Sequence, residues 1–336
     1  MFMNYYSYIL FIPMMIISTI MIFFTSSWFS MWMIMEINMI SFISLLTFEK
    51  SPKNEMLMNY YLVQTFNSFV FLLSMIFIHF TQFNEILIIL MNLVMLTKLG
   101  MPPFYMWYLK MMININWINI LLMSTIQKII PLIIINYIMI FKFSIYMNLL
   151  LMMLSSMFCS IKGLNQNILK IIMTYSSIIQ MTWIITIMLF NETISILYFI
   201  IYSTISINLL ILFNQFNLLN IINIYLIKFN NKKMFYLMLF SIFSLAGLPP
   251  FLGFMMKLIS LKLLFSLIPL STLFIMIMAS LISMYFYLQL IFNNIMINSL
   301  GYKINYKFIN YKYSMNIKLI LLNWLSLIFI ISFDLF

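Results

Sequence analysis

The stretch KLGMPPF at residues 98–104 interrupts a long apolar run, and GLPPF at residues 247–251 interrupts a second one. Two consecutive prolines remove backbone hydrogen-bond donors, and their rings clash with the preceding turn of a helix. A helix that enters either stretch therefore cannot continue through it. The sequence predicts two broken helices, with Gly100, Pro102 and Pro103 at the first break and Gly247, Pro249 and Pro250 at the second.

The sequence around these breaks is too apolar for a water-soluble protein. Of its 336 residues, 65% are hydrophobic and only 7% are charged, and the mean hydropathy is +1.11. No single soluble core can hide so much apolar surface, so lipid must act as the solvent. No polar block is long enough for a soluble domain. We expect an all-α membrane protein with a single polytopic domain over residues 1–336.

Apolar runs of about 20 residues are the length that a bilayer-spanning helix needs. Reading such runs against turn signals predicts about 11 transmembrane helices. Their expected bounds are 5–25, 28–47, 57–80, 84–112, 117–140, 145–161, 168–190, 192–214, 235–263, 268–292 and 315–333.

The two breaks lie an odd number of helices apart, which gives the two halves of the chain opposite orientations in the membrane. This pattern is typical of inverted repeats, in which broken helices meet near the midplane and form an ion path. We expect a first repeat at about 28–140, a second at about 145–292, and a C-terminal helix at about 315–333. Such breaks are tolerated where protein or water covers the freed backbone groups.

Lysines indicate the orientation of the chain. If the N-terminus lies inside, most loop lysines fall on the inner side, and the outer margins hold only Lys142 and Lys262. This agrees with the positive-inside rule. The net charge of +11 is spread over short loops, which favours an anionic lipid surface over nucleic acid as the partner.

Four charged residues fall at bilayer depth: Glu36, Lys98, Lys128 and Lys257. A charge at the centre of a membrane helix costs about 2.5–3.5 kcal/mol if it faces lipid. These side chains must therefore face the protein interior, pair or be hydrated. Their functional interpretation is a proton relay, because a lysine in a dry site between helices releases its proton more easily than in water. The alternative is a fixed ion pair that only orients helices.

Polar side chains recur at helical spacing and could support water chains between the charged residues. The same side chains could equally serve helix packing through hydrogen bonds. For His79, which stands at a predicted helix end, an interfacial position is favoured over a relay role. The candidate hydration path consists of Gln64, Asn67, Ser176, Ser177 and Gln180.

No phosphate-binding loop, dinucleotide glycine fingerprint, cysteine cluster or histidine pair occurs in the sequence. Cys159 is the only cysteine. We therefore expect no cofactor or metal in this chain, and an energy source outside it.

The ordered set of motifs resembles one family over essentially the whole chain. The set consists of MEINM at 35–39, KLGMPPF at 98–104 with Trp107, Gln127 with Lys128, GLNQ at 163–166 running to Tyr175, Ser176 and Ser177, and GLPPF at 247–251 with Lys257. It is similar to the subunit 2 family of mitochondrial NADH:ubiquinone oxidoreductase, respiratory complex I. The lysine-only basic residues and AT-rich character resemble insect members.

This resemblance implies an antiporter-like fold in which Glu36 pairs with Lys98, Lys128 connects and Lys257 ends the relay. It implies neighbours in the membrane arm, especially the antiporter-like subunit 4 and the small subunit 4L, and phospholipids, including cardiolipin. NADH, FMN, iron–sulfur clusters and ubiquinone would belong to other subunits. The expected location is the mitochondrial inner membrane, with the N-terminus on the matrix side and the C-terminus on the intermembrane-space side.

Two residues depart from the family pattern. Gln180 stands where many relatives have histidine, and Lys110 stands where an acid is common. Two other functions remain open at this point: a free-standing cation/proton exchanger, and a structural membrane spacer whose charges only hold helices together.

Overall fold

The computed structural model describes residues 2–49, 54–78, 84–139, 141–221, 224, 232–249 and 251–299. Within these residues eight helices are long and apolar enough to cross a membrane. The same residues contain no named strand, and their one isolated bridge joins Ile168 and Asn220. The predicted all-α membrane fold is confirmed, while the count of eleven helices stays a prediction. His79, Pro250 and the predicted helix at 315–333 lie outside the described residues.

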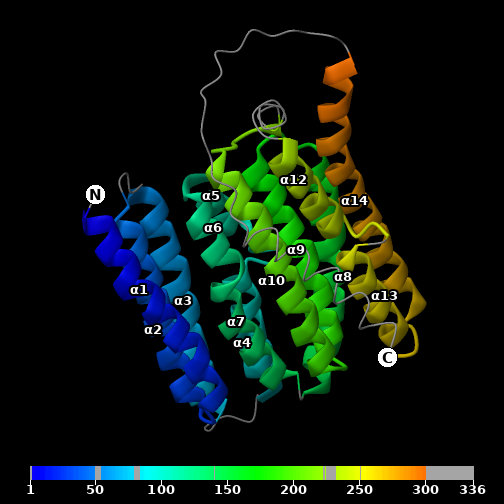
Figure 1. Cartoon of the computed structure of the whole chain (residues 1–336). Helices are drawn as coiled ribbons and strands as arrows, with labels where there is room; N and C mark the ends of the chain where they lie inside the picture. The colour runs from blue at the N-terminus through cyan, green and yellow to red at the C-terminus, as the bar shows by residue number, and fades with distance from the viewer. Residues whose placement is uncertain are drawn as a thin grey trace. The chain divides into compact units, whose positions relative to one another are not determined.

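The chain divides into two compact units, Met1–Ser155 and Ser156–Phe336. The first contains α1 (Phe2–Met21), the 3-10 turn η1 (Ile22–Phe24), α2 (Trp28–Thr47), α3 (Asn54–Ile78), α4 (Asn84–Leu99), α5 (Met106–Asn114), α6 (Trp117–Ser124), α7 (Ile126–Ile138) and the first part of α8 (Lys142–Leu164). Figure 1 shows α1, α2 and α3 side by side, and α2 contacts both of its neighbours. Ser27 caps α2, because its hydroxyl oxygen accepts a hydrogen bond from the Ser30 N–H at 3.3 Å.

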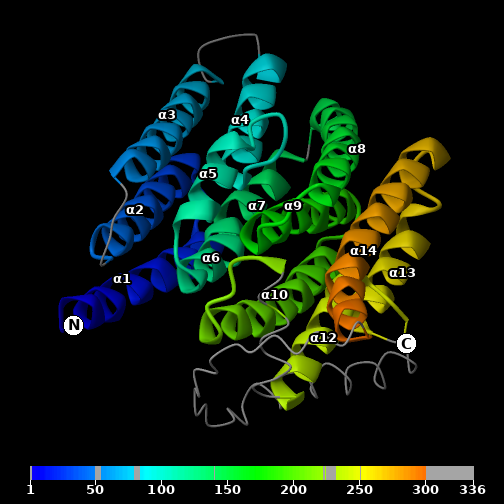
Figure 2. The ribbon, with the colours of Figure 1, turned by 90° about the horizontal axis from the view of Figure 1, so that it is seen from above.

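The second unit contains the rest of α8, then α9 (Leu169–Met188), α10 (Glu192–Gln215), α12 (Lys232–Ala246), α13 (Leu252–Leu264) and α14 (Leu270–Ser299). Helix α9 is its central element, because 94% of its most apolar 18-residue stretch is buried. Helices α10, α13 and α14 each contact it (Figure 2). Most polar groups on a helix that is buried on all sides are hydrogen-bonded.

Both predicted breaks are present and are built alike. Helix α4 ends before Gly100 and helix α12 ends before Gly247, and the two glycines have left-handed φ angles of +72° and +77°. Such a glycine ends a helix in a Schellman motif, in which the next N–H bonds back to a carbonyl five residues earlier. Met101 N donates to Leu96 O at 3.0 Å, and Leu248 N donates to Phe243 O at 3.3 Å.

The span predicted at 117–140 has an interruption that the sequence did not predict. Helix α6 ends at Ser124 and α7 begins at Ile126, with Thr125 at φ −117° and ψ −77°. The Leu121 carbonyl accepts hydrogen bonds from the Thr125 hydroxyl at 2.7 Å and the Ser124 hydroxyl at 3.1 Å. Hydroxyls that bond back to an earlier carbonyl compete with the helical ladder and bend helices. This third interruption lies three residues before Lys128.

Candidate functional site

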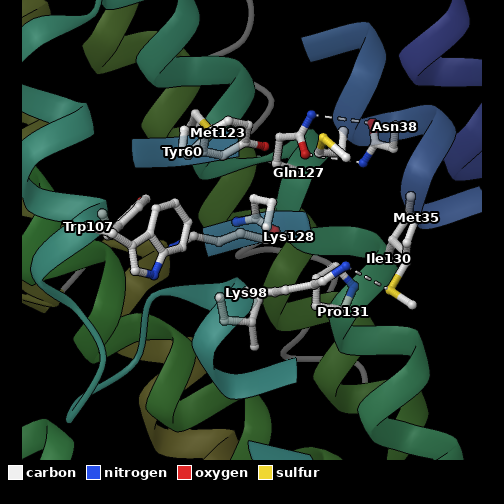
Figure 3. A pocket seen from close by; sticks show the side chains of 14 residues that line it. Met35, Asn38, Tyr60, Lys98, Trp107, Met123, Gln127, Lys128, Ile130 and Pro131 are labelled. Carbon is white, nitrogen blue, oxygen red and sulfur yellow. Dashed lines mark hydrogen bonds between the residues drawn. The ribbon is translucent and has the colours of Figure 1, made fainter. Parts of the chain in front are cut away.

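Lys98 and Lys128 line one cavity in the first unit (Figure 3). The cavity has a volume of about 30 Å³, and its wall includes Gln64 and Tyr60 of α3. A water molecule needs about 10–15 Å³ of such volume and two or more polar partners. The cavity can therefore hold a short water chain between the two lysines.

Lys98 extends from the last turn of α4 toward α2. Its Nζ lies 3.5 Å from the sulfur of Met35, as the dashed line in Figure 3 shows. Met35 directly precedes Glu36, and the Glu36 carboxylate attracts the Lys98 ammonium electrostatically. The Lys98 side chain therefore reaches the turn of α2 that carries Glu36, and the pairing of these two residues stays a prediction.

Lys128 is almost fully buried in the first turn of α7, with 2% of its surface exposed. Its Nζ lies 5.1 Å from the centre of the Tyr108 ring, a cation–π distance. Tyr108 packs against the first break, since a Cβ on Gly100 would lie 2.7 Å from the Tyr108 Cβ. The absence of a side chain at Gly100 therefore gives space to the ring that covers Lys128.

A reciprocal amide pair joins α2 to α7 at the wall of the same cavity. Asn38 Nδ2 donates to Gln127 Oε1 at 3.2 Å, and Gln127 Nε2 donates to Asn38 Oδ1 at 3.3 Å (Figure 3). Both residues belong to the sequence motifs, but sequence reasoning gave them no structural role. A pairing across 89 residues of chain leaves no local pattern that could have revealed it.

A hydrogen bond from the Trp107 indole stabilises the first break. Trp107 Nε1 donates to the carbonyl of Thr97 at 3.0 Å, in the last turn of α4. The same carbonyl also accepts a hydrogen bond from the Gly100 N–H at 3.0 Å. The Trp107 side chain therefore fixes the residue directly before Lys98.

We expect Trp107→Phe to destabilise the assembled protein by about 0.5–1.5 kcal/mol, because the Thr97 carbonyl loses the indole N–H and keeps only the Gly100 N–H, which donates to it at 3.0 Å. The measurement is the temperature at which the purified complex loses half its activity. Trp183→Phe is the matched control, because the buried Trp183 Nε1 donates to no acceptor among the described residues. An equal shift for both variants would contradict the role of the Trp107 hydrogen bond.

Lys257 lies at the second break. Its side chain is 9% exposed on α13, and its Nζ donates to the Ala246 carbonyl at 3.1 Å. Ala246 is the last residue of α12, so the ammonium sits at the negative end of that helix dipole. A Cβ on Gly247 would lie 2.9 Å from the Lys257 Nζ. The second glycine thus leaves room for the lysine itself.

Gln180 donates a hydrogen bond to the backbone carbonyl of Leu245, the residue before Ala246 at the second break. Its Nε2 donates to Leu245 O at 3.4 Å, and its Oε1 accepts from the Tyr198 hydroxyl at 2.7 Å. Gln180 and Tyr198 also line a small cavity of about 10 Å³. The departure from histidine at this position gives a side chain that bridges a tyrosine and a helix end.

The remaining predicted hydration residues are buried. Ser176 and Ser177 donate to carbonyls of their own helix, Met173 and Thr174, at 2.9 and 2.8 Å. Asn67 is 6% exposed, and its Nδ2 finds no partner among the described residues. Gln64 is therefore the predicted path residue that the structure brings to the cavity of Lys98 and Lys128.

The sequence predictions also covered Lys110 and possible metal-binding groups. Lys110 is exposed on α5 and does not line the cavity of Lys98 and Lys128. Within the described part of the chain, no group of three or more His, Cys, Asp and Glu residues could hold a metal ion.

A family model matches most of the chain. Residues 25–283 match the transmembrane domain of the NADH:quinone oxidoreductase/Mrp antiporter family. The chain belongs to this family. The matched range includes all four predicted relay residues of this antiporter-like chain and both of its breaks.

Individual relatives agree with the family. The chain is 34% identical over 300 residues to NADH-ubiquinone oxidoreductase chain 2 of Anopheles gambiae, and the match covers 86% of each chain. It is 33% identical over 297 residues to the protein of the same name from Aedes aegypti, again over 86% of each. Its fold is similar to that of a chain of respiratory complex I from Thermus thermophilus, with 18% identity and a TM-score of 0.77 over 84% of this chain and 69% of the other.

Proposed function

We propose that this chain is an antiporter-like subunit in the membrane arm of a respiratory NADH:ubiquinone oxidoreductase, and that its buried lysines carry protons. The observation that supports this best is the cavity of the first unit. It contains two lysine side chains, has room for water and lies beside a broken helix.

Two ammonium groups that share one cavity repel each other. A proton that arrives on Lys98 therefore favours release of a proton from Lys128, and the reverse also holds. Glu36 attracts Lys98 electrostatically. A change in the charge of Glu36 would therefore act on both lysines of the cavity. Water in the cavity would carry the proton between the two Nζ atoms.

We place Lys257 after these residues, so that the proposed row is Glu36, Lys98, Lys128 and Lys257. The shared Schellman geometry of the two breaks supports the proposed inverted repeats at about 28–140 and 145–292. Gln64, Asn67, Ser176, Ser177 and Gln180 remain the proposed hydration path.

The energy for proton movement would come from other subunits. We propose that NADH, FMN, iron–sulfur clusters and ubiquinone react there, and that quinone reduction changes the charge balance at one end of the row. The proposed neighbours are subunit 4 and the small subunit 4L, and the proposed lipids include cardiolipin.

The chain is a multi-pass membrane protein, and we propose the mitochondrial inner membrane as its location. The lysine distribution supports an N-terminus on the matrix side and a C-terminus on the intermembrane-space side. Protease accessibility of tags at the two ends tests this orientation.

A second candidate, a free-standing cation/proton exchanger, is favoured by the Mrp antiporters that share the family model. Purification separates the two candidates. Our proposal expects the chain to co-purify with an NADH-oxidising assembly. Cation/proton exchange by the chain alone in liposomes would favour the exchanger.

We expect Lys98→Met to lower the number of protons pumped per NADH oxidised in the assembled complex, because methionine cannot hold a proton. The measurement is proton uptake into vesicles during NADH oxidation. Lys110→Met removes an exposed lysine of the same unit and should leave the ratio unchanged. An unchanged ratio in Lys98→Met would remove this lysine from the relay.

A further inference from the structure

A second polar contact joins α2 to α6, outside the cavity of the two lysines. Glu49 follows the end of α2, and its Oε1 accepts a hydrogen bond from Nδ2 of Asn119. Asn119 lies in the first turn of α6 and is completely buried, with 0% of its surface exposed. The positive end of the α6 dipole favours a carboxylate at this position.

Tyr8 of α1 completes the cluster. Its hydroxyl interacts with both the Glu49 carboxylate and the Asn119 amide. The rings of Phe11 and Phe48 stack with centroids 5.9 Å apart, which fixes α1 against the end of α2 next to Glu49. The cluster is therefore held by three helices.

The contact between Glu49 and Asn119 is half of a reciprocal pair. The Oδ1 of Asn119 is buried and has no hydrogen-bond partner among the described residues. A buried acceptor without a donor is costly and uncommon. A carboxylic acid and an amide can form two hydrogen bonds at once, N–H to carboxyl oxygen and O–H to amide oxygen, and only the first is present here.

Two amide pairs in the described part of the same unit show the complete arrangement. Asn38 and Gln127 exchange both hydrogen bonds, and so do Asn92 and Asn148, at 2.9 and 3.3 Å. Reciprocal hydrogen bonding is therefore the arrangement that both of these buried amide pairs adopt. The Glu49 and Asn119 pair becomes equivalent to them when one proton is added to Glu49.

We propose that Glu49 and Asn119 form a proton-uptake site for the cavity of Lys98 and Lys128. The carboxylate takes a proton from a hydronium ion at the membrane surface, which leaves a water molecule and forms an O–H bond at Oε2. This O–H donates to Asn119 Oδ1. The proton then passes to a water molecule on the cavity side, and the carboxylate regains its charge.

The position of the pair suits this role, which rests on the proposed function. Asn38 precedes Thr47, the last residue of α2, by nine residues, so the end of the helix that Glu49 follows lies about 14 Å along the axis from the cavity wall. The pair lies where α2 ends and α6 begins, the end that the lysine distribution assigns to the matrix side. Helix α2, with the α6 and α7 span, therefore connects the surface to the buried lysines.

The Glu49→Gln substitution in the assembled complex distinguishes proton uptake by Glu49 from a purely structural role of its hydrogen bonds. Glutamine can make both hydrogen bonds to Asn119 but carries no exchangeable carboxyl proton. We expect normal assembly and an unchanged or higher inactivation temperature, together with the same loss of protons per NADH as in Lys128→Met. Glu49→Asp keeps a carboxyl and should retain part of the pumping.

Glu55→Gln is the matched control, because it removes an exposed acid from the first turn of α3 and should change nothing. Normal pumping in Glu49→Gln, when Lys128→Met has lost it, would overturn the uptake site and leave the proposed function intact. Normal pumping in Lys128→Met would refute the proposed function itself. Failure of Glu49→Gln to assemble would contradict the reciprocal pairing on which the inference rests.

Discussion

Replacing Lys128 by methionine is expected to slow proton delivery in the assembled complex by about 10²-fold, the lower range for loss of a group that transfers protons. Lys128 is almost completely buried, and its Nζ lies over the Tyr108 ring. Methionine fills a similar volume without a charge that must be desolvated. We therefore expect stability to be kept or improved while pumping is lost.

The measurements are proton pumping driven by NADH and the thermal inactivation of the same preparation. Lys162→Met is the matched control: Lys162 also lies over an aromatic ring, 5.8 Å from the centre of Phe158, but it is exposed. The control should pump normally. A stable Lys128→Met complex with normal pumping would support a structural spacer instead, because opposite effects on stability and pumping are expected only for a relay group.

Gly253→Ala should have the largest effect on folding. Gly253 lies on α13, and a Cβ there would overlap the carbonyl oxygen of Ser244 on α12. Neither atom is the end of a flexible side chain, so the two helix segments at the second break would have to separate. Overpacking of this kind costs about 1–3 kcal/mol and occasionally more. We expect a strong decrease in assembled complex, measured after native electrophoresis.

Gly163→Ala provides the comparison within the same unit. A Cβ at Gly163 would lie 3.1 Å from a ring carbon of Phe286, so this neighbour needs to shift by only a few tenths of an ångström. Because alanine also favours the helix over glycine by about 0.5–1 kcal/mol, we expect little net change. Equal assembly of the two variants would show that α12 and α13 tolerate separation at Gly253.

The two breaks could be predicted because proline acts through its own covalent structure, whatever surrounds it. The burial of Lys128 and Lys257 also followed from sequence, since their positions inside apolar runs leave no route to water. The membrane-spanning character and the helix breaks each depend on residues within one short segment of the sequence. In the structure, α4 ends before Gly100 and α12 ends before Gly247, as predicted.

The interruption at Thr125 could not be predicted with the same ease. Serine and threonine hydroxyls bond back to a carbonyl in many straight helices, so their presence alone does not mark a break. A weak signal was present: Ser124 and Thr125 precede Pro131 within one span, and Pro131 removes the donor that would bond the Gln127 carbonyl.

Contacts between residues far apart in the chain could not be predicted from the sequence. The Glu49 and Asn119 pair joins positions 70 residues apart, and the residues between them give no pattern that relates the two. The hydrogen bond of Lys257 to Ala246 was missed for a different reason. Sequence reasoning sought acidic partners for buried lysines, whereas here a helix end freed by proline supplies a backbone oxygen.

The small cavity of the first unit has a consequence for ion selectivity. Its volume of about 30 Å³ accommodates roughly two water molecules. A sodium or potassium ion needs several oxygen ligands, and it would meet two ammonium groups of its own sign. A proton needs neither space nor a ligand shell, because it moves by exchanging bonds along the water. In the proposed relay, the dimensions and charge of this cavity would therefore favour protons over metal cations without a dedicated filter.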